Sequence, residues 1–227
     1  MERLRPIDLL DPLGVDEVVV DDALRQIEVF TPEGLLLALW HGPSDASRVV
    51  ILLGGGLGGT LGPAGALYHR LGRRLATSGI GAIRIHYRRP GDLERCVVDA
   101  GAVADLAAQR GARAFAVVGH SFGGAVAVNL GAAIPSAVVG VATLSTQSAG
   151  CQPAAALAPR PFLLIHGEDD EIVPAASSRQ VQLLAGGHGE VEILPGAGHG
   201  LSGVAEHVEL RLLDWIQTTF AGSRAQE

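Results

Sequence analysis

The stretch Gly119-His120-Ser121-Phe122-Gly123-Gly124 decides the fold, because it places a serine between small residues where an apolar strand gives way to an apolar helix. The preceding run, residues 114–118, is typical of a buried strand, whereas residues 125–134 are too long and too rich in alanine to form another one. A sharp turn at Ser121 would strain its backbone and lift its hydroxyl clear of the sheet edge. Glycines two positions to either side fit that turn, since a side chain there would collide with neighbouring segments.

The glycine content of the chain offers a competing explanation for this pattern. With 31 glycines among 227 residues, a Gly-x-Ser-x-Gly sequence can arise by chance. Its position between a strand and a helix favours a nucleophile instead, because that junction exposes a serine to a substrate.

Length and charge limit the class of protein. A chain of 227 residues can bury a sizeable core, and we expect one domain over residues 1–227. The balance of 17 basic and 24 acidic residues gives a formal charge of −7, which offers no basic surface for nucleic acid or an anionic membrane. This charge favours a small polar or neutral molecule as the partner, and nothing in the sequence supports a homo-oligomer.

The two cysteines and the N-terminal segment exclude further classes. Cys96 and Cys151 have neither CxxC spacing nor a histidine cluster beside them, so we expect no metal site and no disulfide framework. Residues 1–11 carry arginines and aspartates but no long apolar run, so we expect neither a signal peptide nor a membrane anchor. A cytoplasmic location is the default expectation.

The order of the apolar segments predicts an α/β fold. Residues 24–30 and 35–40 flank the turn sequence Thr31-Pro32-Glu33-Gly34, which is typical of an antiparallel hairpin. From residue 49 onward strand-like and helix-like segments alternate, which favours a mostly parallel central sheet with helices on both faces. The expected strands are 49–53, 82–85, 114–118, 138–144, 162–165 and 191–194, and the expected helices are 64–77, 93–109, 125–134 and 204–218.

Two further segments carry polar side chains directly after expected strands. Residues 166–174 (HGEDDEIVP) follow one strand, and His199 lies among glycines after the next. Functional groups in open α/β sheets gather at such strand ends. The order serine, acid, histidine is that of a serine hydrolase on this kind of sheet. The chemistry needs all three, since a hydroxyl becomes nucleophilic when a neutral imidazole accepts its proton and a carboxylate holds that imidazole in one tautomer.

The acidic segment has a structural alternative, because carboxylates after a strand usually form a solvated turn or a helix cap. The presence of Ser121 and His199 after other expected strands favours the catalytic interpretation here. Asp170 is preferred over Asp169 as the acid, and Glu168 and Glu171 are expected at the surface.

The histidines also have alternatives. His199 could be an exposed loop residue, but no other histidine follows a strand among glycines in this way. We expect His120 to pack beside the serine and His166 to form a local hydrogen bond. None of the eight histidines has metal-ligand spacing such as HExxH, so a metal hydrolase is not expected.

The segment Gly54-Gly55-Gly56-Leu57-Gly58-Gly59 allows two interpretations. It matches GxGxxG between a strand and a helix, as a dinucleotide site does, but residues 60–91 contain no Asp or Glu to hold a ribose. Arg88 and Arg89 could meet the extra phosphate of NADP, so an NADP-binding oxidoreductase is the minor alternative. The other interpretation is a backbone N–H group for an oxyanion hole, paired with the N–H of Phe122.

Together these motifs resemble the α/β-hydrolase superfamily over nearly the whole chain, and they are most similar to its small, lidless dienelactone-hydrolase-like and carboxylesterase-like members. The matching sequences are GHSFGG at 119–124, HGEDDEIVP at 166–174 and GAGH at 196–199. The resemblance implies a triad of Ser121, Asp170 and His199. It also places the family's His-Gly-x-Gly loop on residues 55–58, which implies that the backbone N–H of Leu57 is the second oxyanion donor. The N–H of the neighbouring residue is the alternative donor. This chain has Gly55 at the position where the family usually has the histidine. Dienelactone hydrolases proper use a cysteine, so their substrate is not implied.

The sequence therefore predicts a serine hydrolase without a cofactor that cleaves carboxylic esters through an acyl-enzyme. The same triad can cleave a thioester or an amide or transfer an acyl group, and a non-catalytic binding protein is the alternative from another class. Residues 145–161 are too few and too rich in proline to form a lid. Aromatic residues make up only 4% of the chain, so we expect a shallow pocket that prefers acyl chains of roughly two to six carbons.

Overall fold

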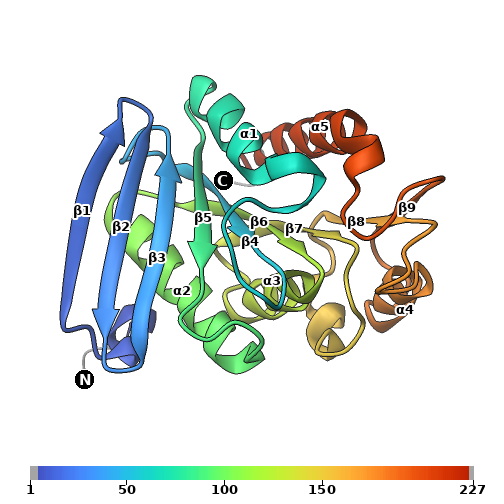
Figure 1. The fold of residues 1–227 in the computed structure, drawn as a ribbon, viewed down its shortest axis with the longest axis horizontal. Helices are drawn as coiled ribbons and strands as arrows, with labels where there is room; N and C mark the ends of the chain where they lie inside the picture. Colours follow the sequence, from blue (N-terminus) through green and yellow to red (C-terminus); the bar gives the residue numbers. More distant parts are fainter. Residues whose placement is uncertain (1–4, 225–227) are drawn as a thin grey trace.

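The computed structural model describes residues 5–224, which form a nine-stranded sheet with the strand order β1-β2-β3-β5-β4-β6-β7-β8-β9 (Figure 1). The expectation of one domain over residues 1–227 stays a prediction, and residues 1–4 of the N-terminal segment lie outside the described residues. The strands are β1 (Gly14–Asp21), β2 (Leu24–Thr31), β3 (Gly34–His41), β4 (Arg48–Leu53), β5 (Gly81–His86), β6 (Ala114–His120), β7 (Val138–Leu144), β8 (Phe162–Gly167) and β9 (Glu190–Leu194). The helices are α1 (Pro63–Thr77), α2 (Leu93–Gln109), α3 (Phe122–Ala133), α4 (Ala176–Leu184) and α5 (Ala205–Arg224), with short 3₁₀ helices η1 (Pro6–Leu10), η2 (Gln152–Leu157) and η3 (Ser202–Val204).

The sheet is antiparallel at its N-terminal end and parallel over the rest. β2 and β3 pair as the expected hairpin, with Thr31 opposite Gly34 at the turn, and β3 pairs antiparallel with β5. From β5 to β9 every neighbouring pair is parallel. Most connections between the parallel strands are helical, as parallel neighbours require. The mostly parallel sheet with an N-terminal hairpin is confirmed.

Strand β1 is the one strand that the sequence analysis did not predict. Every residue of β1 is exposed, although four of its eight residues are valine. It forms the edge of the sheet and pairs antiparallel with β2. Because neither face is buried, the strand lacks the alternation of apolar and polar residues that marks a half-buried strand.

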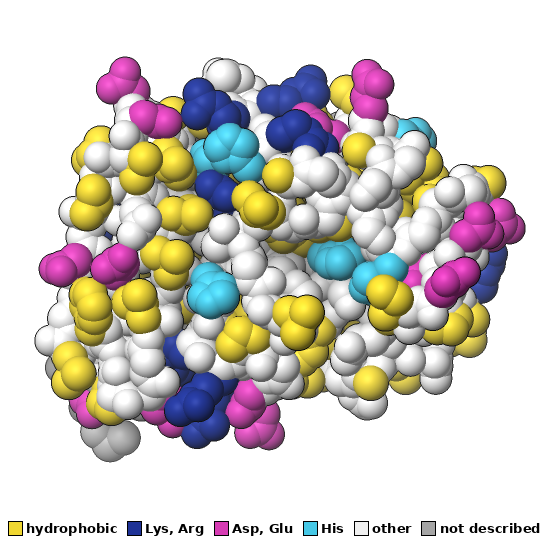
Figure 2. Space-filling view, in the orientation of Figure 1, with side chains coloured by type: hydrophobic (Ala, Val, Ile, Leu, Met, Phe, Trp, Pro, Cys, Tyr) yellow, Lys and Arg dark blue, Asp and Glu magenta, His cyan; other side chains and the backbone are white. Residues whose placement is uncertain are grey.

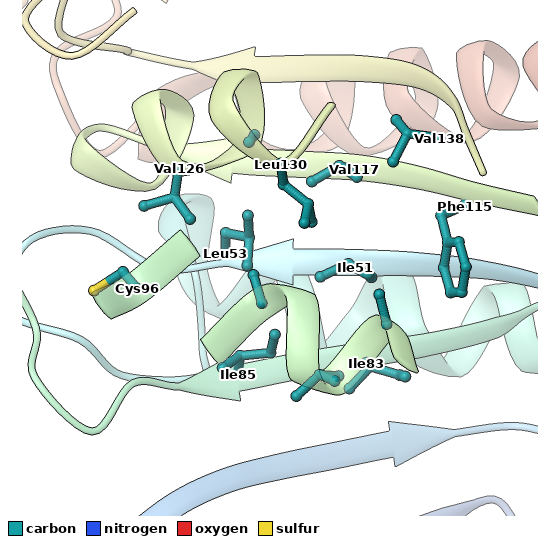
Figure 3. Close-up of a cluster of buried hydrophobic side chains, with 14 of the residues drawn as sticks. Ile51, Leu53, Ile83, Ile85, Cys96, Phe115, Val117, Val126, Leu130 and Val138 are labelled. Carbon is teal, nitrogen blue, oxygen red and sulfur yellow. The ribbon is translucent and has the colours of Figure 1, made fainter. Parts of the chain in front are cut away.

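Helices cover both faces of the parallel region and divide the core in two. Residues of α2 and α3 lie on one face and residues of α1 and α5 on the other. Figure 3 shows the first cluster, in which Ile51 and Leu53 of β4 lie between β5 and β6 on the face that α2 and α3 cover. Side chains two positions apart on a strand share a face, so each strand from β4 to β8 contributes to both clusters and is mostly apolar.

The predicted site residues follow the C-terminal ends of the parallel strands, which lie together along one side of the sheet. β6 ends directly before Ser121, β8 ends at Gly167 before the acidic segment, and β9 ends at Leu194 before the histidine loop. Between β7 and β8 the chain contains only η2, in agreement with the expectation of no substantial lid. Among residues 5–224, no helix is both long enough and apolar enough to cross a membrane.

Candidate active site

Ser121 lies at the sharp turn that the sequence predicts. Its backbone has φ 54° and ψ −119°, which is outside the regions that ordinary residues adopt, and its N–H donates to the carbonyl of Leu144 at 2.8 Å. A side chain at Gly119 would collide with the backbone of Gly123, and one at Gly123 would collide with the end of β4. The two glycines therefore allow β6, α3 and the glycine loop to approach closely around the serine.

Asp170 is held more firmly than the other acidic residues of its segment. Its side chain is fully buried, and its Oδ1 accepts hydrogen bonds from the N–H groups of Ile172 at 2.9 Å and Val173 at 2.8 Å. Its Oδ2 lies 2.8 Å from Nδ1 of His199. The other three carboxylates of the segment, Glu168, Asp169 and Glu171, are exposed. The structure therefore brings Asp170, and not its neighbours, to the histidine.

The surroundings of Asp170 set the tautomer of His199. Burial opposes ionisation of this carboxyl, but hydrogen bonds from Val173, the His199 ring and Ile172 outweigh it and hold the pKa of Asp170 below its ordinary value of 3.8. An ionised carboxylate only accepts, so Nδ1 of His199 carries the proton and donates it. Nε2 of His199 is then left free to accept a proton from another group.

Ser121, His120 and His199 line one cavity of about 560 Å³. His120 lies beside the histidine loop, with its Nε2 at 3.1 Å from the backbone oxygen of His199 and the two rings 4.9 Å apart. Burial lowers the pKa of His120 to about 4, so this ring is neutral at pH 7 and donates its Nε2–H to that carbonyl. His120 thus packs beside the serine and also supports the loop that carries His199.

His166 forms the local hydrogen bonds expected of it, and one of them reaches the candidate acid Asp170, which the sequence did not predict. Its ring is fully buried, with Nε2 at 3.1 Å from Oδ2 of Asp170 and 2.8 Å from the carbonyl of Val173, and with Nδ1 at 2.7 Å from Oγ of Ser178. Both partners of Nε2 are acceptors, so this nitrogen carries the proton and the Ser178 hydroxyl donates to Nδ1. Asp170 therefore lies between two imidazoles. The one signal of this contact in the sequence is that His166 and Asp170 lie only four residues apart.

The glycine loop approaches the serine through two of its glycines. A methyl group added to Gly55 would lie 3.8 Å from Cβ of Ser121, and one added to Gly56 would lie 3.6 Å from Cβ of Phe122. The side chain of Leu57 is 98% exposed at the tip of the loop, next to Gly56 in the chain. Leu57 as the second oxyanion donor stays a prediction, and the contact of Gly56 with Phe122 favours Gly56 as the alternative.

The NADP interpretation of the glycine loop finds no support in the position of Arg88. Its guanidinium is 3% exposed and forms an ion pair at 2.6 Å with the fully buried Asp99, and a second one at 3.3 Å with Glu33. These carboxylates already neutralise the charge that a phosphate would need. The loop borders Ser121 and His199 instead.

The two cysteine thiols are not placed to act as nucleophiles. Cys96 and Cys151 are both free and buried, and burial raises the pKa of Cys96 to about 12 and that of Cys151 to about 11. Both therefore stay protonated near pH 7 and are inert. Within the part of the chain that the structure describes, no group of three His, Cys, Asp or Glu side chains is placed to hold a metal ion.

Among the residues that the structure describes, no Asp, Glu, Lys or Arg lines the cavity beside Ser121. Three large aliphatic residues from its lining are exposed, namely Leu57 (98%), Leu61 (57%) and Ile172 (72%). Figure 2 shows two neighbouring histidine side chains near the middle of this face, whereas charged side chains gather toward its edges. A slightly larger hollow of about 600 Å³ beside α1 is lined by three arginines and contains no serine or histidine. The serine and histidine of the predicted triad therefore lie on the cavity at Ser121 and not on the larger hollow.

Buried histidines should make the stability of the fold depend on pH. Burial lowers the pKa of His41 and of His120 from 6.5 to about 4. Between these values the unfolded chain binds protons that the folded chain does not, so the free energy of unfolding should fall as the pH drops below 6.5, by up to about 1.4 kcal/mol per ring and pH unit. Urea unfolding at a series of pH values measures this. A midpoint that is constant from about pH 7 to pH 4.5 would contradict the burial of these rings.

Comparison with known proteins gives structural relatives only. No family model and no curated protein matches the sequence. The structure is similar to Est1E from Butyrivibrio proteoclasticus, with a TM-score of 0.68 and 16% identity over 92% of this chain and 99% of that one. It is also similar to a dienelactone hydrolase from Anabaena variabilis, with a TM-score of 0.69 and 17% identity over 90% and 98% of the two chains. An α/β serine hydrolase homologue from Coxiella burnetii gives a TM-score of 0.69 and 18% identity over 87% and 98%.

These likenesses extend over nearly the full length of both chains, so they concern the whole architecture. The chain has the α/β-hydrolase fold, as the motifs predicted. At such low identity the likeness establishes the fold alone, because one fold hosts many unrelated functions.

Proposed function

We propose that the protein is a serine hydrolase that cleaves carboxylic esters through Ser121, His199 and Asp170. The observation that carries the proposal is the hydrogen bond of 2.8 Å between Asp170 and Nδ1 of His199, on the same cavity as a serine with a strained backbone. A carboxylate at Nδ1 leaves Nε2 as the base, which is the arrangement that activates a hydroxyl.

The reaction follows from these roles in two steps. In the first, Nε2 of His199 takes the proton of the Ser121 hydroxyl while Oγ attacks the ester carbonyl, and the proton then passes to the departing alcohol. In the second, His199 takes a proton from water, the resulting hydroxide attacks the acyl-enzyme, and Ser121 leaves with that proton restored. Asp170 orients the ring and stabilises its positive charge in both steps.

Backbone N–H groups would stabilise the negative oxygen that forms in each step. Phe122 is the first residue of α3, and the first N–H groups of a helix have no partner inside the helix. Its N–H is one donor in this proposal, and the glycine loop supplies the second through Leu57 or Gly56. Donors that are already in place stabilise the transition state more than the substrate.

The triad itself does not select the leaving group. A thioester substrate or transfer of the acyl group to another alcohol would use the same atoms, and a binding protein on this fold would use none of them. We propose hydrolysis of an ester because it needs only the three triad residues and water. A panel that includes an oxygen ester, the matching thioester and an added alcohol acceptor distinguishes these alternatives.

The lining of the cavity favours an uncharged substrate with a short aliphatic acyl group. Among the described residues that line the cavity there is no Asp, Glu, Lys or Arg, and its exposed rim residues Leu57, Leu61 and Ile172 are aliphatic. Without a lid the acyl chain would remain partly in water, so each added methylene would gain less than the about 0.8 kcal/mol of full burial. Est1E has been observed with ferulic acid bound, but no Phe, Tyr or Trp is among the described residues that line the cavity of this chain.

Ester hydrolysis should therefore peak at acyl chains of roughly two to six carbons, because a shallow site buries few methylenes. The measurement is kcat/KM for p-nitrophenyl esters of increasing acyl length, with a feruloyl ester as an aromatic comparison. Short aliphatic esters should be preferred, and the rate should not jump when the substrate forms micelles. An optimum at long chains, or such a jump, would show that a covering element exists.

A further inference from the structure

We propose that His86, at the end of β5, is a positioning residue that holds the glycine loop in the conformation needed for oxyanion binding. The inference rests on the proposed function and deepens it. Nδ1 of His86 lies 2.9 Å from the backbone nitrogen of Gly59, which donates its N–H to the ring. Among the side-chain hydrogen bonds found in residues 5–224, only this one reaches residues 55–59.

The loop has two arms, and His86 contacts the second, returning arm. The first arm contains Gly55 and Gly56, which lie against Ser121 and Phe122. The chain then turns, with the N–H of Gly58 donating to the carbonyl of Gly55 at 2.9 Å. The turn therefore couples the arm beside the serine to the arm beside His86.

The returning arm requires glycine, and the His86 ring packs against it. Gly58 and Gly59 have φ values of +75° and +91°, which favour glycine. A Cβ on Gly58 would lie 3.0 Å from Cε1 of His86 and 2.9 Å from Cγ of Pro90. The ring and the proline thus form a wall on one side of the arm, and the Gly59 hydrogen bond fixes its position along that wall.

A loop of this composition needs such an anchor. Five of the six residues 54–59 are glycine, which loses more conformational freedom on ordering than any other residue. The resemblance to the family also places a glycine, Gly55, where a histidine usually begins this loop. His86 contacts the loop from the neighbouring strand, because β4 and β5 are parallel neighbours that end at the same edge of the sheet.

The hydrogen bond defines which side chains could replace His86. The ring accepts at Nδ1, so it must be the neutral tautomer with the proton on Nε2. Asparagine carries its oxygen Oδ1 at the same distance along the side chain as Nδ1 and can accept from Gly59. Leucine has a similar volume but no acceptor, and glutamine carries its oxygen one bond too far.

The test compares His86→Leu with His86→Asn, and uses His207→Leu as the control. His207 lies on α5 with its side chain 55% exposed, and its ring contacts Glu192 rather than any residue of the candidate site. Steady-state kinetics with a short-chain ester should show a kcat about ten- to a hundredfold lower for His86→Leu with little change in KM, since outright removal of one oxyanion donor costs about a hundred- to a thousandfold. His86→Asn should recover most of the loss, and His207→Leu should match the wild type.

A second measurement does not depend on hydrolysis. Hydrogen exchange should be faster at the Gly59 amide and over residues 55–59 in His86→Leu than in the wild type or in His86→Asn. A wild-type kcat in His86→Leu, an equal loss in both His86 variants, or a rise of KM alone would each overturn the inference. If His86→Leu does not fold, His86→Gln takes its place against His86→Asn with the same criteria. Absence of any ester hydrolysis in the wild type would overturn the proposed function, while unchanged exchange would overturn the anchor alone.

Discussion

Ser121→Ala is expected to lower kcat/KM for a short-chain ester by a factor of about a thousand or more while the fold stays intact. The substitution removes the atom that attacks the carbonyl, so no acyl-enzyme can form, and only binding and the oxyanion donors remain to accelerate the reaction. The methyl group of alanine fits the strained turn as well as the serine does, because the backbone there is set by β6, α3 and the neighbouring strands. The measurement is steady-state hydrolysis, with the unfolding midpoint recorded in parallel.

Ser78→Ala is the matched control for this experiment. Ser78 is exposed at the C-terminal end of α1 and does not line the cavity. Its removal should leave both kcat/KM and the unfolding midpoint unchanged. A loss of less than about tenfold in Ser121→Ala would show that another group carries the reaction.

Asp170→Asn is expected to lower kcat by about a thousand- to ten-thousandfold, close to the effect of losing the acid in a serine triad. The amide cannot hold a negative charge against the imidazolium of His199, and its NH₂ group favours the wrong tautomer of the ring. The same substitution also removes the charge that His166 contacts at 3.1 Å. Rapid-mixing or steady-state hydrolysis of a short-chain ester measures the loss.

Asp169→Asn is the internal control, because it makes the same chemical change one residue away. The side chain of Asp169 is exposed, and the structure shows only its backbone N–H engaged, in a 2.9 Å hydrogen bond to Ala197. The variant should retain activity within about threefold of the wild type, as exposed substitutions usually do. If Asp169→Asn were the more damaging change, the acid would have to move by one position.

Much of the fold could be predicted from the sequence, because its central strands are buried on both faces and its helices either carry an apolar stripe or, like α3, are apolar nearly all round. The predicted strand 138–144 and the predicted helix 93–109 match β7 and α2 to the residue. β1 could not be predicted, since a strand at the sheet edge with all residues exposed has no buried face to impose a pattern. Helix α3 begins at Phe122 and not at residue 125, because the two glycines after the serine are helical in spite of their low propensity.

The site residues that lie in a recognisable local motif could be predicted from the sequence. Those that belong to the site only through contacts between distant parts of the chain could not. Ser121 and His199 stand out by their neighbours in the sequence. Asp170 was preferred among four adjacent acids through the resemblance of residues 166–174 to the family, and the structure shows that Asp170 is buried. His166 and His86 were missed as contacts of the site. The hydrogen bond from Gly59 to His86 spans 27 positions in the chain, and nothing in either local sequence indicates it.

The most direct test of the central claim is covalent labelling with a fluorophosphonate, followed by peptide mass spectrometry. A phosphonate forms a bond with a serine that is activated by a neighbouring imidazole, so labelling reports the triad without any assumption about the natural substrate. We expect one adduct per chain, on the peptide that contains Ser121, and no adduct in Ser121→Ala. An adduct on any other residue, or an unlabelled wild-type protein that is correctly folded, would contradict the central claim.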